Sequence, residues 1–181
     1  IRDSSVTGVQ TCALPISKTR WIVIFVILVA LQLLALGYSS SPETGSTEGL
    51  DKSDTAWLLV ATAMVLFMTP GLSFFYGGMV SVKNVISTML QSFIALGVIS
   101  LLWYLVGFSL AFGDSIGGFI GNPATFFAFH NVGTGVHPAL SPTVPLMLFA
   151  FFQLKFAIIT PALITGSFAE RVKFTSYLIF M

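Results

Sequence analysis

Charged residues are scarce in this sequence. Lys, Arg, Asp and Glu together make up 8% of its 181 residues, whereas hydrophobic residues make up 55%. A soluble globular domain has about 25% charged residues, so there is too little polar side chain here to cover a water-facing surface. We therefore expect a lipid bilayer to surround much of the chain. The formal net charge of +1 gives no reason to expect a nucleic-acid partner.

Cysteine is almost absent too, because Cys12 is the only one. A disulfide within the chain and a cysteine-based metal site are therefore both excluded. The sequence also lacks the motifs of serine hydrolases, zinc proteases and phosphate-binding loops. We predict no metal, no cofactor and no enzymatic activity.

What the sequence has instead is long hydrophobic runs. They cover residues 55–80, 85–112 and 145–168, and a further run begins at 174 and reaches the last residue, 181. A helix rises about 1.5 Å per residue, so about 20 residues cross a hydrocarbon core of about 30 Å. No strand-like alternation is present, which favours helices over a barrel. The predicted fold class is an all-α, multi-pass transmembrane bundle, truncated after three to four membrane helices.

The first third of the chain divides into short segments. Residues 1–17 contain VTGVQTCALPI, which resembles a translated sequencing adapter, so we expect a non-native leader; a genuine soluble leader is the alternative. Residues 18–38 place two basic residues before an apolar core and small residues. This pattern favours a cleaved signal peptide, with an uncleaved first hydrophobic helix as the alternative. Residues 39–54 form a polar linker, and 55–181 the membrane domain.

The placement of the basic residues predicts an orientation. If Lys18 and Arg20 are cytoplasmic, three crossings after the leader bring Lys83, Arg171 and Lys173 to the same side. The polar linker and its acidic residues then lie outside, and Lys52 is the one loop cation that also falls on the outer side. This arrangement agrees with the excess of positive charge in cytoplasmic loops of membrane proteins. The predicted location is the plasma membrane.

One hydrophobic run carries an aromatic stripe. At about 100° per residue, Phe152, Phe156, Ile159 and Leu163 fall within one narrow sector of a helix. Two rings stacked along a helix can narrow a passage or bind a cation on their π faces. Packing against a neighbouring helix is the competing interpretation, and it is the commoner case for such stripes.

Lys155 is an ionisable residue within the same run. An ammonium group near the middle of a bilayer costs about 2.5 kcal/mol or more, so a function or a partner is expected. Lys155 lies about 60° from Phe152 around the helix, beside the stripe. Pointing into a cation path it would repel the cation. We therefore expect it to snorkel or to bond to carbonyl groups of a neighbouring helix or subunit, with a pore-lining role as the alternative.

The other titratable candidates have structural explanations. His130 and His137 lie in a segment rich in glycine and proline between two runs, which favours ordinary loop histidines over a proton relay or a metal site. Glu170 and Arg171 follow an apolar run directly. They are expected to form an interfacial ion pair and to complete the end of a helix.

Three motifs together resemble a known family. FMTPGLSFFYGGMV at 67–80, KNV at 83–85 and FQLKFAIITPALITGSFAER at 152–171 are similar to motifs of the ammonium transporter family of the Amt/Mep/Rh type, in family order and spacing. The resemblance runs from about residue 51 to 181. It implies an N-terminal fragment, with three membrane helices and the start of a fourth, of a protein that moves ammonium across a membrane.

The resemblance also implies roles for individual residues. Phe156 matches the ring that gates the outer vestibule, and Phe152 a ring of the external recruitment site. Leu72, Phe75 and Tyr76 match residues along the lower conduction path, and Leu163 a hydrophobic pore-lining position. The paired pore histidines of the family, the tryptophan of its recruitment site and a nearby structural aspartate belong to later helices. His130 and His137 do not match these pore histidines.

The resemblance further implies partners and leaves rivals. It implies ammonium or ammonia as substrate, a homotrimer in which each subunit has its own pore, and a cytoplasmic regulator of the PII type. The first rival is an ammonium sensor, in which a transporter-like membrane domain is coupled to a signalling output. The second is an unrelated transporter or a membrane-anchored scaffold. We expect that this chain alone does not conduct, because it carries only part of a vestibule.

Overall fold

The computed structural model describes residues 46–169, 171–172 and 174–181, together with isolated helical positions between 23 and 34. The predictions for the leader, for Glu170 and for Lys173 lie outside the described residues. So do the predictions for most of residues 18–38 and for most of the polar linker.

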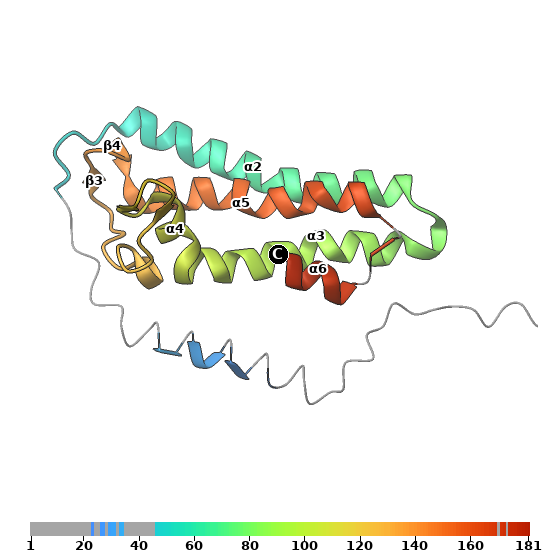
Figure 1. Cartoon of the computed structure of the whole chain (residues 1–181). Helices are drawn as coiled ribbons and strands as arrows, with labels where there is room; N and C mark the ends of the chain where they lie inside the picture. Colours follow the sequence, from blue (N-terminus) through green and yellow to red (C-terminus); the bar gives the residue numbers. More distant parts are fainter. Residues whose placement is uncertain are drawn as a thin grey trace, which may run out of the picture.

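Three long helices lie side by side in the described part of the chain (Figure 1). They are α2 (Lys52–Met79), α3 (Val85–Leu102) and α5 (Leu146–Phe168). The π-helix η2 (Trp103–Gly107) continues α3 into α4 (Phe108–Phe112), so that one helix runs from Val82 to Phe112. These three helices are long and apolar enough to cross a membrane. The predicted all-α, multi-pass bundle is confirmed.

Local sequence determines where α2 begins and ends. The Asp51 carboxylate accepts hydrogen bonds from the N–H groups of Ser53 at 2.6 Å and Asp54 at 3.2 Å, which satisfies two free donors of the first turn. The helix therefore starts three residues before the expected position 55. It continues through Pro70 and ends before the short 3-10 turn η1 (Val82–Asn84).

The connection between α4 and α5 contains short strands that the sequence did not indicate. β1 (Ser115–Ile116) pairs antiparallel with β2 (Ile120–Gly121), and β3 (Val136–His137) pairs antiparallel with β4 (Ser141–Pro145). The 3-10 turn η3 (Phe127–Phe129) lies between the two strand pairs in the chain. Two-residue strands are too short to show alternation in a sequence. The Ser109 hydroxyl ties this connection to α4. It donates to the Asn122 carbonyl at 2.7 Å and accepts from the Phe126 N–H at 2.9 Å.

The core lies where this connection meets η2, α4 and α5. Its buried residues are Phe108, Phe126, Val132, Leu146 and Ala150. Trp103 packs edge-on against Phe108 at 5.9 Å between ring centroids, and its indole N–H donates to the Ala150 carbonyl at 3.2 Å. Tyr104 packs against Phe129 at 5.2 Å. Both aromatic residues therefore pack against side chains of the core and of the connection.

The Trp103 hydrogen bond gives a first stability prediction. Replacing Trp103 with phenylalanine keeps a ring in the core but removes the donor, so the free energy of unfolding in detergent should fall by about 1 kcal/mol. Trp57→Phe is the matched control, because Trp57 is 74% exposed on α2. Equal unfolding curves for the two variants would contradict this role of Trp103.

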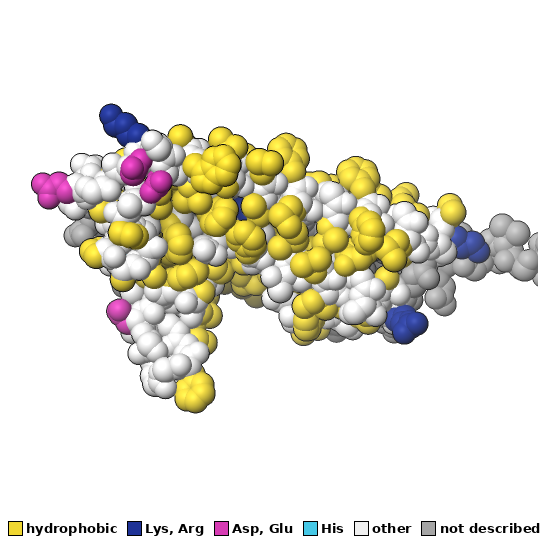
Figure 2. All heavy atoms as spheres, turned by 90° about the horizontal axis from the view of Figure 1, so that it is seen from above, with side chains coloured by type: hydrophobic (Ala, Val, Ile, Leu, Met, Phe, Trp, Pro, Cys, Tyr) yellow, Lys and Arg dark blue, Asp and Glu magenta, His cyan; other side chains and the backbone are white. Residues whose placement is uncertain are grey.

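The last helix, α6 (Phe174–Phe180), packs back on α5. Tyr177 is 1% exposed, and its hydroxyl donates to the Pro161 carbonyl at 3.3 Å. Elsewhere the helices present a largely apolar surface, with hydrophobic side chains along the visible face and acidic ones gathered at one end (Figure 2). Such a surface fits a hydrocarbon surrounding.

Candidate functional site

The two aromatic rings of the predicted stripe lie against each other on α5. Phe152 and Phe156 meet with ring centroids 5.1 Å apart and planes inclined by 77°. Phe156 is 40% exposed and Phe152 is half-buried. Because the residues are four apart on one helix, the helix itself sets this edge-to-face contact. Part of the Phe156 side chain is therefore exposed beside the contact between the two rings.

A second group of candidates meets further along α5. The Tyr76 hydroxyl, on α2, donates to the Leu163 carbonyl at 2.9 Å. Phe75 packs beside Tyr76 with ring centroids 5.5 Å apart. Leu163 is 50% exposed and lies about 10 Å beyond Phe156 along the helix axis. The structure thus brings Tyr76 to Leu163, and Phe75 lies beside Tyr76.

Two further residues of the predicted set are Leu72, on α2, and Ile159, on α5. Leu72 lies one turn before Tyr76 on the same side of α2, and it is half-buried. Ile159 is 6% exposed, so that part of the stripe is already covered by the neighbouring helices. The candidate residues therefore lie on two helices that pack against each other, and the hydrogen bond from Tyr76 to the Leu163 carbonyl joins the two sets.

Gly166 is a residue of this site that the sequence analysis missed. A Cβ atom at Gly166 would lie 2.5–2.6 Å from the Cε1, Cζ and hydroxyl oxygen atoms of Tyr76. Tyr76 can therefore reach the Leu163 carbonyl only because position 166 has no side chain. The signal was present in the sequence, since Ala162 and Gly166 form a pair of small residues four apart, which allows close helix approach in membranes.

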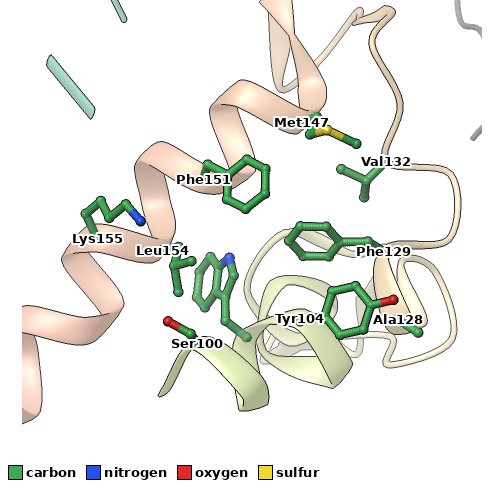
Figure 3. A pocket seen from close by; sticks show the side chains of 10 residues that line it. Ser100, Tyr104, Ala128, Phe129, Val132, Met147, Phe151, Leu154 and Lys155 are labelled. Carbon is green, nitrogen blue, oxygen red and sulfur yellow. The ribbon is translucent and has the colours of Figure 1, made fainter. Parts of the chain in front are cut away.

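A cavity of about 500 Å³ lies on another side of α5. Figure 3 shows the side chains around it, with Lys155 at one edge. Its lining comes from α5, from the end of α3 with η2, and from the connection: Met147, Phe151, Leu154, Lys155; Ser100, Trp103, Tyr104; Ala128, Phe129, Val132. Phe152 and Phe156 are not among these residues. The cavity is therefore separate from the aromatic pair.

Lys155 lines this cavity and not the aromatic pair. It makes no ion pair and no hydrogen bond with another residue that the structure describes. Its ammonium group is thus unpaired within that part of the chain. The expectation that Lys155 lies beside the stripe agrees with this placement, whereas its expected partner does not lie among the described residues.

The two histidines belong to the connection between α4 and α5. His130 follows η3, and His137 lies in β3, where its Nδ1 accepts a hydrogen bond from the Leu140 N–H at 3.2 Å. The His137 ring also packs edge-on against Phe126 at 6.3 Å. Among the described residues, no group of three or more His, Cys, Asp or Glu could hold a metal ion.

Comparison with known proteins identifies the chain. The model of the Ammonium Transporter Family matches residues 56–181. The ammonium transporter of Aquifex aeolicus (strain VF5) is 46% identical over 149 residues, which cover 81% of this chain and 34% of that protein. The ammonium transporter of Mycobacterium tuberculosis (strain ATCC 25618 / H37Rv) is 45% identical over 143 residues, covering 72% of this chain and 30% of that protein.

The solved structures agree with this similarity. The crystal structure of Saccharomyces cerevisiae Mep2 superposes with a TM-score of 0.63 at 34% identity, and the match covers 74% of this chain and 29% of that one. Fold and comparisons together define a multi-pass helical membrane protein. The chain belongs to the ammonium transporter family. It spans about a third of the length of the curated relatives that it matches.

Proposed function

We propose that this protein moves ammonium across the membrane and that the stripe on α5 forms part of the route. The observation that carries this proposal is the Phe152–Phe156 pair, with centroids 5.1 Å apart, on a helix that belongs to the matched region of an ammonium transporter family member. The names of the two relatives described above, both called ammonium transporters, point the same way.

The aromatic pair supplies the recruitment chemistry. An ammonium ion on the π face of a phenylalanine gains about 0.5–2 kcal/mol, depending on how far water is excluded. This attraction does not require a carboxylate, which would hold the ion too firmly for it to move on. Phe152 would line the recruitment site, and Phe156 would close the passage beneath it.

The residues beyond Phe156 favour the passage of neutral ammonia over that of the ammonium ion. Beyond Phe156 the next exposed residue of the stripe is Leu163, since Ile159 is covered, and the stripe has no charged side chain there. An ammonium ion would lose its hydration there without compensating contacts, so ammonia is favoured. The proton of the ammonium ion would then have to leave before this stretch and cross by another route. Leu72, Phe75 and Tyr76 of α2 would flank this lower stretch and limit its width.

The route is incomplete in this chain. The resemblance assigns the pore histidines and the tryptophan to helices outside the matched region, and the chain spans about a third of its curated relatives, so this chain alone should not conduct. The test is a chimera in which residues 56–181 replace the matched region of the Aquifex aeolicus protein. Liposomes with the chimera should show ammonium-dependent current, and liposomes with the 181-residue chain alone should not. A silent but folded chimera, or current from the short chain, would refute the proposal.

The membrane orientation is part of the same proposal. Lys83 follows α2 and Arg171 follows α5, while Asp51, Asp54 and Asp114 belong to the opposite ends of the helices. This separation supports a cytoplasmic side for Lys83 and for Arg171/Lys173, and an outer side for the polar linker, in the plasma membrane. The homotrimer and the PII-type regulator stay predictions from the family resemblance.

Lys155 should not set ion selectivity. Because it lines the cavity beside Phe151 and not the Phe152–Phe156 pair, Lys155→Met in the chimera should leave the preference for ammonium over potassium unchanged. Any loss should appear as lower stability of the assembled protein, where a partner of the ammonium group is left unpaired. Unchanged folding together with altered selectivity would reverse this assignment.

A further inference from the structure

The β1–β2 hairpin carries the most exposed large hydrophobic side chain of the described residues. Phe119 is 98% exposed, and its neighbours Ile116 and Ile120 are 52% and 50% exposed. Figure 2 shows an arm that projects sideways at the loop end of the bundle, with a hydrophobic side chain at its tip. Three apolar side chains on a projecting turn are unfavourable in water, which favours a surface that covers them.

Two backbone N–H groups of this tip are hydrogen-bonded within the hairpin. Gly117 and Gly118 have φ values of +63° and +80°, the left-handed conformation that a tight turn needs. The Phe119 N–H donates to the Ile116 carbonyl at 3.3 Å, and the Gly118 N–H donates to the Ser115 hydroxyl at 3.1 Å. These donors are satisfied within the hairpin, so leaving water costs less than it would for an open loop.

The hairpin lies next to the end of a long apolar helix. It follows α4 directly, at the end of the helix that runs from Val82 to Phe112 and can cross a membrane. Its base stays polar, because the Thr125 hydroxyl donates to the Asp114 carboxylate at 3.3 Å. Between Asp114 and Lys155 the sequence contains no Lys, Arg, Asp or Glu. The tip therefore has neither a charge to keep it in water nor one to pair with a protein partner.

We propose that Ile116, Phe119 and Ile120 insert into the headgroup and upper acyl region of the lipid leaflet at the loop end, as a lateral anchor for the outer connection. A lipid surface fits better than a second copy of the chain. A stable protein interface buries about 800 Å² on each partner, far more than three side chains offer, whereas membrane insertion gains with each apolar group. Because the tip is neutral, insertion does not depend on lipid charge.

Spin labelling tests this anchor in the whole chain reconstituted in phosphatidylcholine vesicles. A nitroxide is attached to Phe119→Cys in a Cys12→Ser background, and its collision rates with oxygen and with a water-soluble nickel chelate are compared. Thr134→Cys, at an exposed polar loop position, is the matched control. Phe119 is almost fully exposed, so its replacement leaves the packing of the fold intact.

The expected result is preferential collision with oxygen at position 119, by severalfold over position 134, in both neutral vesicles and vesicles with phosphatidylglycerol. A label at 119 that meets the nickel chelate as often as the label at 134 does would overturn the proposal. So would a label shielded from both reagents, which indicates a protein contact. An insertion that requires phosphatidylglycerol would overturn the argument from neutrality.

Discussion

Replacing Phe156 with leucine in the chimera should raise the ammonium concentration for half-maximal current by about 2- to 30-fold. This range corresponds to the loss of about 0.5–2 kcal/mol of cation–π attraction. Leucine keeps an apolar side chain at the position, so the helix stays packed and the maximal current should not fall in proportion. Current measured against ammonium concentration separates the two effects.

Phe151→Leu is the control for this experiment. Phe151 is 42% exposed and Phe156 is 40% exposed on the same helix, but Phe151 faces the cavity and packs against Phe129 at 6.0 Å between ring centroids. The account predicts an unchanged half-maximal concentration for Phe151→Leu. Equal shifts in the two variants would mean that the change reports a general loss of aromatic packing in α5 and not ion binding.

Replacing Gly166 with alanine should give the largest loss of stability of any single methyl addition in α5. The new Cβ would meet the Tyr76 ring at 2.5 Å, so the ring must move and the hydrogen bond from Tyr76 to the Leu163 carbonyl must break. Overpacking of this kind costs about 1–3 kcal/mol, and the lost hydrogen bond about 1 kcal/mol more. The free energy of unfolding in detergent measures the sum.

Gly97→Ala is the matched control for overpacking. A Cβ atom at Gly97, in the middle of α3, meets no heavy atom within 4 Å. Alanine is also the better helix former, so stability should stay the same or rise slightly. If the two alanine variants unfold alike, the missing side chain at Gly166 is not what makes room for Tyr76. The contact between Tyr76 and Leu163 would then not depend on Gly166.

The membrane helices could be predicted from the sequence because a single physical requirement determines them. In hydrocarbon, every backbone donor and acceptor must be satisfied within the segment, so an apolar run of sufficient length forms a helix. The run expected at 145–168 corresponds to α5 at Leu146–Phe168, and the run expected at 85–112 ends at Phe112 as α4 does. The same periodicity predicted that Phe152 and Phe156 share one face, and their rings are in contact.

Contacts between segments were harder to predict. The crossing of Tyr76 from α2 to Leu163 joins residues 87 positions apart, and the periodicity of either helix alone does not reveal it. The connection between α4 and α5 folds around Ser109 and the aromatic core, with strands of two to five residues. Its glycine and proline content indicated turns but not their pairing. The π-helix at Trp103–Gly107 has no sequence signal in a uniformly apolar run.

The most direct test of the central claim is thiol accessibility at the aromatic pair. Phe152→Cys and Phe156→Cys are introduced singly into the chimera after its other cysteines are removed, with Phe151→Cys as control. Both sites should react with a charged, membrane-impermeant thiol reagent added from outside, and ammonium should slow the reaction at both, but not at Phe151→Cys. Reaction of Phe152→Cys and Phe156→Cys with a lipid-soluble reagent only, without protection by ammonium, would place the rings against acyl chains and contradict the account.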